Sequence, residues 1–132
     1  MDLEEWLGDS DALAALDSAY AAAWKATDER LLGLCRDRVA MLLGHSPRLE
    51  EMSAEALQSL RAWTTSDVFT PLDRAALDFT EQYVIDVSSM TDAQAEKLRA
   101  HVGDEGLASF VYALLVIEQR MTLELSLDSV LR

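Results

Sequence analysis

Few side chains in this 132-residue sequence carry nucleophilic or near-neutral acid–base chemistry: one cysteine and two histidines. Cys35 falls within a predicted helix, on or near its apolar stripe, where a thiol is more often a small core residue than a nucleophile. His45 follows a predicted helix end, with Arg48 and two glutamates close behind. A histidine can act as a general acid or base, and Arg48 could hold a substrate carboxylate. The alternative for His45 is an exposed ring whose charge favours the helix C-terminus.

Three further residues are candidates for a pocket. Glu118 and Arg120 follow an apolar run near the C-terminus, and either could face a ligand pocket or join an ion pair across a subunit interface. Trp63 falls at the spacing of core residues on a predicted helix, so we expect it to pack in the core. The alternative is that it forms the wall of a pocket. His101 lies in a predicted last helical turn, as a partner for the helix dipole. No metal-ligand spacing, glycine-rich phosphate loop or G-x-S-x-G motif occurs, so we expect no metal or cofactor.

The charge balance narrows the classes of partner. Asp and Glu number 24 against 11 Lys and Arg, for a net charge of −13. Such a chain repels nucleic acid and anionic membranes unless basic residues cluster, and no cluster is present. The same charge tells against a carboxylate substrate unless Arg38, Arg48 or Arg120 reverses the sign locally. With no leader-like N-terminus and no apolar run of membrane-spanning length, we expect a cytoplasmic protein.

Start and stop signals divide the chain into about six helices and no strands, which predicts a single all-α domain over residues 1–132. Helix starts are indicated at Ser10, Thr27, Ser53, Thr70 and Thr91, and the last two have Asp or Gln in the capping-box position. Gly44 and Gly103 mark helix ends, and Asp104 caps the last helix. The segment from His45 to Met52 is expected to be turn-like.

The last predicted helix carries an apolar run with no polar face, Phe110 to Ile117. A surface helix shows polar residues at the helical period, so this helix lies in a core or between subunits. Because a small domain rarely surrounds one helix completely, we expect a homo-oligomer assembled through this run. A helix threaded through the monomer core is the alternative.

Four segments occur in a recognisable order along the chain. They are Asp28–Leu32 with Arg38–Gly44, Met52–Leu57 with Ala62–Trp63, Phe69–Leu77, and Leu98–Leu107. Together they resemble carboxymuconolactone decarboxylase-like and alkyl hydroperoxidase D-like (AhpD-like) proteins. The resemblance covers about residues 12–127 and implies an AhpD-like helical fold.

The redox site that this family implies is missing from the sequence. The family carries a CxxCxxxH motif, in which a second thiol resolves the intermediate disulfide. Aligned on Arg38-Val39 and Gly44, its two cysteines fall on His45 and Arg48, its histidine on Met52 and an upstream glutamate on Gly33. The segment from Gly44 to Trp63 is also about two helical turns shorter than in the family.

Three hypotheses of function follow. The first is a divergent, non-redox member of this family that acts as an oligomeric binding or structural module, with a small-molecule ligand as one option. The second is an enzyme that uses acid–base chemistry at His45 on a small carboxylate or lactone. The third is a one-cysteine hydroperoxide reductase that uses Cys35 with an external thiol.

Overall fold

The computed structural model describes residues 3–131, and within them every regular element is helical. The last helix contains one non-helical residue, Gly103, with φ 77° and ψ 175°. It therefore consists of the two predicted helices, and all six predicted helices are present. The elements are α1 (Leu3–Leu7), α2 (Asp11–Ala26), α3 (Glu29–Leu43), α4 (Ser46–Glu50), α5 (Ala54–Arg61), α6 (Pro71–Asp86), the 3₁₀ turn η1 (Val87–Ser89) and α7 (Asp92–Leu131).

Side-chain caps fix most of these helix starts. The hydroxyls of Ser10 and Ser53 accept hydrogen bonds from backbone N–H groups in the first turns of α2 and α5. Thr70 and Asp73 form a complete capping box at α6. The prediction was one residue early at α3, where Asp28 rather than Thr27 is the cap. Asp28 accepts from Leu31 N at 2.9 Å, which leaves Thr27 as the end of α2.

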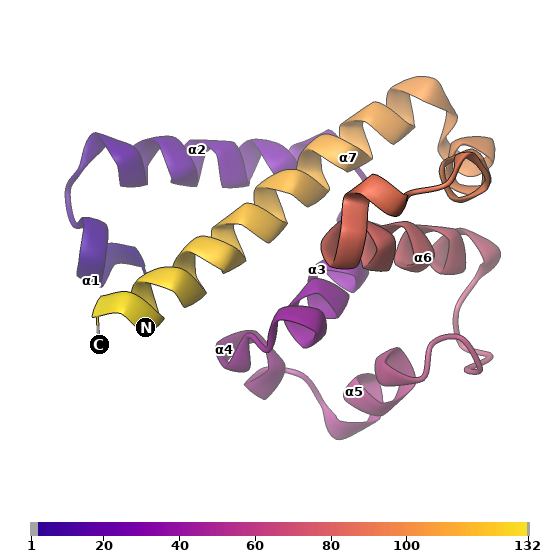
Figure 1. The fold of residues 1–132 in the computed structure, drawn as a ribbon, viewed down its shortest axis with the longest axis horizontal. Helices are drawn as coiled ribbons and strands as arrows, with labels where there is room; N and C mark the ends of the chain where they lie inside the picture. The colour runs from indigo at the N-terminus through magenta and orange to yellow at the C-terminus, as the bar shows by residue number, and fades with distance from the viewer. Residues whose placement is uncertain (1–2, 132) are drawn as a thin grey trace.

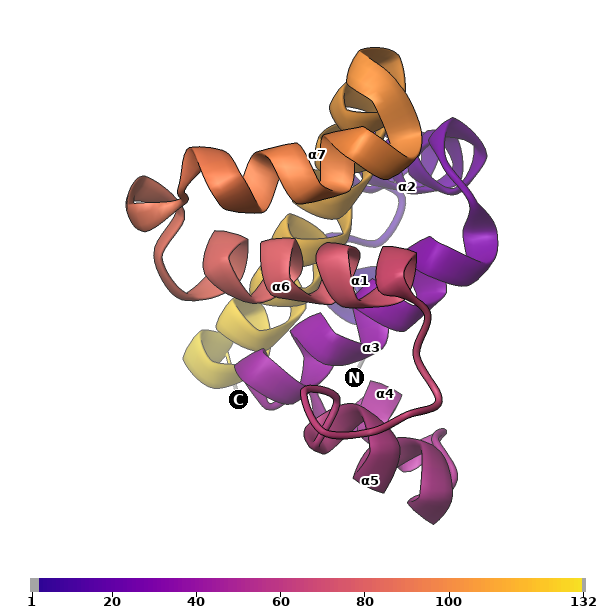
Figure 2. The same cartoon turned by 90° about the vertical axis from the view of Figure 1, so that its right-hand side faces the viewer.

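The core forms where α2, α3, α6 and α7 meet. Figure 2 shows the first part of α7 running along α6 before it turns sharply, and Figure 1 shows the rest of α7 crossing beside α2. Phe79 of α6 and Phe110 of α7 meet edge to face, with ring centroids 6.0 Å apart. In a smaller hydrophobic cluster, Leu60 of α5 and Trp63, which follows α5, pack with Leu77 of α6.

Half of the residues of the apolar run in α7 are buried within the monomer. Its buried members are Phe110, Ala113, Leu114 and Ile117. Tyr112 and Leu115 lie on the opposite side, with 42% and 37% of their surfaces exposed. α7 is long and apolar enough to cross a membrane, but a single helix that meets this test of length and composition is weak evidence of a membrane span. The buried side chains place this helix in the core of the four-helix arrangement.

Candidate functional site

His45 begins a helix rather than a turn. Gly44 ends α3 in the left-handed conformation, with φ 71°, and turns the chain so that α4 starts at once. The Nδ1 atom of His45 accepts a hydrogen bond from Arg48 N at 3.3 Å and caps α4. The expectation of a turn-like segment was therefore wrong. The signal that could have revealed α4 is Ser46-Pro47, because proline is favoured in the first helical turn.

His45 is also buried, with 7% of its surface exposed, so the reading of an exposed ring at a helix C-terminus was wrong. Its Nε2 atom lies 3.1 Å from Oε2 of Glu124 on α7. Because Nδ1 accepts from a backbone N–H, the neutral ring carries its proton on Nε2 and donates it to Glu124. Both ring nitrogens thus have partners, one in α4 and one in α7.

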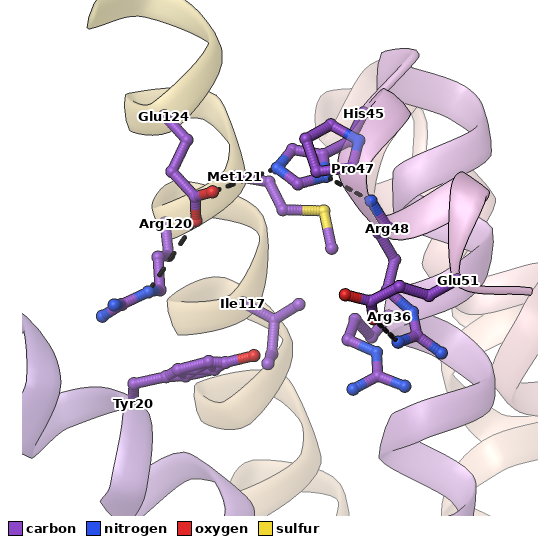
Figure 3. Close-up of a pocket in the computed structure, with 10 residues that line it drawn as sticks. All are labelled: Tyr20, Arg36, His45, Pro47, Arg48, Glu51, Ile117, Arg120, Met121 and Glu124. Atoms are coloured by element: carbon purple, nitrogen blue, oxygen red, sulfur yellow. Dashed lines mark hydrogen bonds and ion pairs between the residues drawn. The ribbon is translucent and has the colours of Figure 1, made fainter. Parts of the chain in front are cut away.

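The His45–Glu124 pair forms one wall of a cavity of about 290 Å³ between α2, α3, α4 and α7. Figure 3 shows Glu124, Met121 and Ile117 on α7, facing the side chains of α3 and α4, while Arg120 on the same helix extends toward Tyr20. Ile117 and Met121 are almost fully buried and form an apolar base. The ten residues that line the cavity are Tyr20, Arg36, His45, Pro47, Arg48, Glu51, Ile117, Arg120, Met121 and Glu124.

Two guanidinium groups on the α3–α4 side share one carboxylate. Asp37 accepts from Nε of Arg48 at 2.7 Å and from Nε of Arg36 at 3.1 Å. Nη1 of Arg48 also donates to Glu51 at 2.6 Å. The hydrogen bond to Asp37 is the main cause that raises the pKa of Arg48 above its ordinary value. Since each guanidinium has five N–H donors, these pairs orient Arg36 and Arg48 and leave donors over for a ligand.

Arg120 supplies the third guanidinium, from the α7 side. It lies over the ring of Tyr20, with 4.6 Å between the guanidinium carbon and the ring centroid. Its Nη2 donates to Asp17 at 3.0 Å, and its Nε lies 3.8 Å from Glu124, the pairing that the four-residue spacing predicts. Its Nη1 is buried without a hydrogen-bond partner among the described residues. A buried donor without a partner is rare in folded proteins.

Cys35 is separate from this cavity. It is fully buried in the core between α3 and its neighbours and is not among the cavity-lining residues. Burial raises its pKa from 9.0 to about 12. The geometry therefore agrees with the core interpretation of this thiol.

The remaining sequence candidates lie elsewhere. Glu118 accepts from Thr122 at 2.9 Å, as its spacing predicts, and lines a groove between α2 and α7 that Arg120 also borders. Trp63 is 8% exposed and donates its indole N–H to Glu81 at 2.7 Å, so it belongs mainly to the core. His101 is exposed on the first part of α7.

Sequence reasoning missed two features of the cavity. Neither Arg36 nor Glu124 was singled out from the sequence as a candidate site residue, although both line the cavity. Within residues 3–131, no group of three or more His, Cys, Asp or Glu side chains is arranged to hold a metal ion. The structure thus brings His45, Arg48 and Arg120 together and leaves Cys35, Trp63 and Glu118 outside.

No protein-family model matches this sequence, and no curated protein matches it. Among solved structures, it is similar to a crystal structure of an Agrobacterium tumefaciens protein of unknown function, for which the antioxidant defence protein AhpD is the suggested identity. The TM-score is 0.76 and the sequence identity 20%, over 90% of this chain and 89% of the other. This likeness shows that the chain has an AhpD-like helical fold.

Proposed function

We propose that this AhpD-like chain is a divergent, non-redox binding module that holds a small carboxylate in the His45 cavity. One observation carries the proposal: Arg36, Arg48 and Arg120 all line a single cavity whose base is apolar. Guanidinium groups bind carboxylates through two parallel hydrogen bonds. These cations are already paired with Asp37, Glu51, Asp17 and Glu124, so a ligand carboxylate binds by replacing one of these acids, and the exposed Glu51 is the one that it replaces.

The loss of the redox function rests on the cysteine count and on Cys35 itself. A dithiol cycle needs two thiols, and the chain has one. A pKa of about 12 leaves Cys35 protonated near neutral pH, and its side chain has no exposed surface for a peroxide to contact. We therefore do not favour the one-cysteine hydroperoxide reductase.

A titration followed by NMR tests carboxylate binding. Propionate is the probe and the uncharged propionamide its control, with backbone amides from Gly44 to Glu51 and the Met121 methyl group as reporters. We expect propionate alone to move these signals. Arg48→Gln and Arg36→Gln should each weaken binding about tenfold, the effect of losing a hydrogen bond to a charged group.

Arg99→Gln is the matched control, because Arg99 also pairs with two carboxylates, Glu96 and Asp104, but lies away from the cavity. It should leave the propionate affinity unchanged. Equal binding of propionamide, or equal weakening by Arg99→Gln, would show that the cavity does not recognise the carboxylate.

Proton transfer by His45 on the bound molecule is the second candidate, and the contact between Nε2 and Glu124 favours it. Since Nδ1 caps α4, the chemistry would pass through Nε2 and Glu124. Decarboxylation of a β-keto acid, acetoacetate, is the assay. Turnover that Glu124→Gln abolishes would support this candidate, and a rate equal to that in buffer would reject it.

We also propose self-association through the exposed part of the apolar run in α7, where Tyr112 and Leu115 face solvent. Sedimentation velocity of Leu115→Glu tests it. Val68→Glu is the control, since Val68 is a 64% exposed apolar residue on a different segment. The proposal predicts that only Leu115→Glu lowers the sedimentation coefficient, and a wild-type monomer would reject it.

A further inference from the structure

A second hollow, of about 630 Å³, lies between α6 and the first part of α7. Its lining residues are Trp63, Pro71, Arg74, Ala75, Asp78, Lys97, Ala100 and His101, none of which borders the His45 cavity. Figure 2 shows these two helix segments running side by side. We call this hollow the α6–α7 groove.

The groove collects cations that lack acidic partners. Within residues 3–131, six arginines form ion pairs with carboxylates. The lysines and arginines without such a pair there are Lys25, Arg61, Arg74 and Lys97, and the last two both line the groove. In a chain with 24 acids and 11 bases, a basic side chain finds an acid easily. Two of the four unpaired cations thus line the same hollow.

Arg74 is fixed in place without being neutralised. Its Nη1 donates to the carbonyl oxygens of Trp63 and Thr64 at 3.1 and 3.2 Å, and its Nη2 donates to Ser66 O. These acceptors carry no formal charge, so the positive charge of Arg74 persists at the edge of the groove. The loop that follows α5 thus orients the Arg74 guanidinium through carbonyl oxygens rather than through an ion pair.

Lys97 and His101 complete the polar rim from α7. They are four residues apart and share one helix face, opposite Arg74 and Asp78 on α6, which are also four apart. Arg74 and Lys97 against Asp78 give one net positive charge when His101 is neutral. Screening limits the reach of the distant acids to about 10 Å, so the nearby cations dominate the local field.

The floor of the groove is apolar and rigid. Trp63 and Ala75 are 8% and 7% exposed, and Pro71 and Ala100 flank them. The indole N–H of Trp63 is bound to Glu81, so the ring cannot turn freely. A rigid apolar floor beside a cationic rim suits a molecule with one oxyanion and a flat apolar body.

We propose that the α6–α7 groove binds a small organic carboxylate with a flat apolar body, whose carboxylate lies at Lys97 and Arg74. The apolar body of the ligand covers the apolar floor near Trp63. Its carboxylate replaces water around Lys97 and Arg74, neither of which forms an ion pair with an acid. This site is independent of the His45 cavity, and either can exist without the other.

Titration with benzoate, followed through the Trp63 indole signal and the amides from Lys97 to His101, tests the proposal. Benzyl alcohol supplies the ring without the charge, and inorganic phosphate supplies the charge without the ring. We expect benzoate to move these signals with saturation and the other two to leave them unmoved. Failure of benzoate to do so, or an equal response to either control, overturns the proposal.

Variants separate the groove from the His45 cavity. Lys97→Ala should weaken benzoate binding about two- to fivefold, the effect of one partly exposed ion pair, and Lys97→Glu should weaken it further. Lys97→Arg should restore it. Lys25→Ala is the matched control, an exposed unpaired lysine outside the groove. Groove signals that respond to Arg48→Gln or Lys25→Ala as strongly as to Lys97→Ala overturn the assignment.

Discussion

The reactivity of Cys35 offers the sharpest test of the core interpretation. The pKa of about 12, against 9.0 for an ordinary thiol, lowers the thiolate fraction about a thousandfold. At pH 8 this means about one thiolate in ten thousand molecules rather than about one in ten. Since only the thiolate is nucleophilic, alkylation in the folded protein should be at least a thousandfold slower than in the unfolded chain.

Iodoacetamide labelling followed by intact-mass measurement is the assay, with the same protein in guanidinium chloride as the reference. Residual labelling of the folded protein should speed up at denaturant concentrations below the unfolding transition, because the reagent must wait for an opening of the core. If Cys35 in the folded protein is alkylated at a rate within about tenfold of that in the unfolded chain, the reasoning is refuted and Cys35 is again a candidate nucleophile.

Three further predictions concern stability. Burial pushes the pKa of Asp73 upward, but hydrogen bonds from Arg30 and Thr70 outweigh it and hold the pKa below its ordinary 3.8; Asp73→Asn should therefore lower the unfolding free energy at pH 7 by about 1–3 kcal/mol. The difference in unfolding free energy between wild type and variant, measured by urea titration, should shrink as the pH falls below 3.8 and through the folded pKa, because Asp73 stabilises the fold only while it is ionised. A difference that does not depend on pH would contradict this explanation. Trp63→Phe removes the N–H donated to Glu81 and should cost about 0.5–1.5 kcal/mol in the same assay, with Trp24→Phe as the comparison. Gly103→Ala should lower the unfolding free energy by about 1–3 kcal/mol, because essentially only glycine adopts a φ of 77° with a ψ of 175°. The added methyl group would meet no atom within 4 Å, so the cost comes from the backbone alone. An unchanged melting curve would show that the bend in α7 relaxes.

Local chemistry made most of the helices predictable. Ser53 and the Thr70–Asp73 capping box mark helix starts within four residues of sequence, and the structure forms them as expected. Gly103 separates two helices because no other residue tolerates its backbone conformation readily. The short α4 was missed because its cap is a histidine ring, which capping preferences rank outside the usual Ser, Thr, Asp and Asn.

The cavity could not be predicted in the same way. His45 and Glu124 are 79 residues apart, so no periodicity or motif relates them. Their contact depends on how α7 crosses α3, which is decided by the packing of side chains such as Phe110 and Val39 in the shared core. Sequence spacing could pair Arg120 with Glu124 on one helix, but only the tertiary arrangement brings Arg120 to the same cavity as Arg48.

A protein this acidic can still bind a carboxylate at Arg48, because the two acids that contact Arg48 differ in how exposed they are. The side chain of Asp37 is 16% exposed and holds the guanidinium through Nε, whereas that of Glu51 is 67% exposed and contacts Nη1. An exposed ion pair contributes about 0–1 kcal/mol, so a ligand carboxylate can replace Glu51 at small cost. Asp37 then still orients Arg48. One acid thus positions the cation and the other is an exchangeable partner, which lets a chain of net charge −13 keep a binding site for an anion.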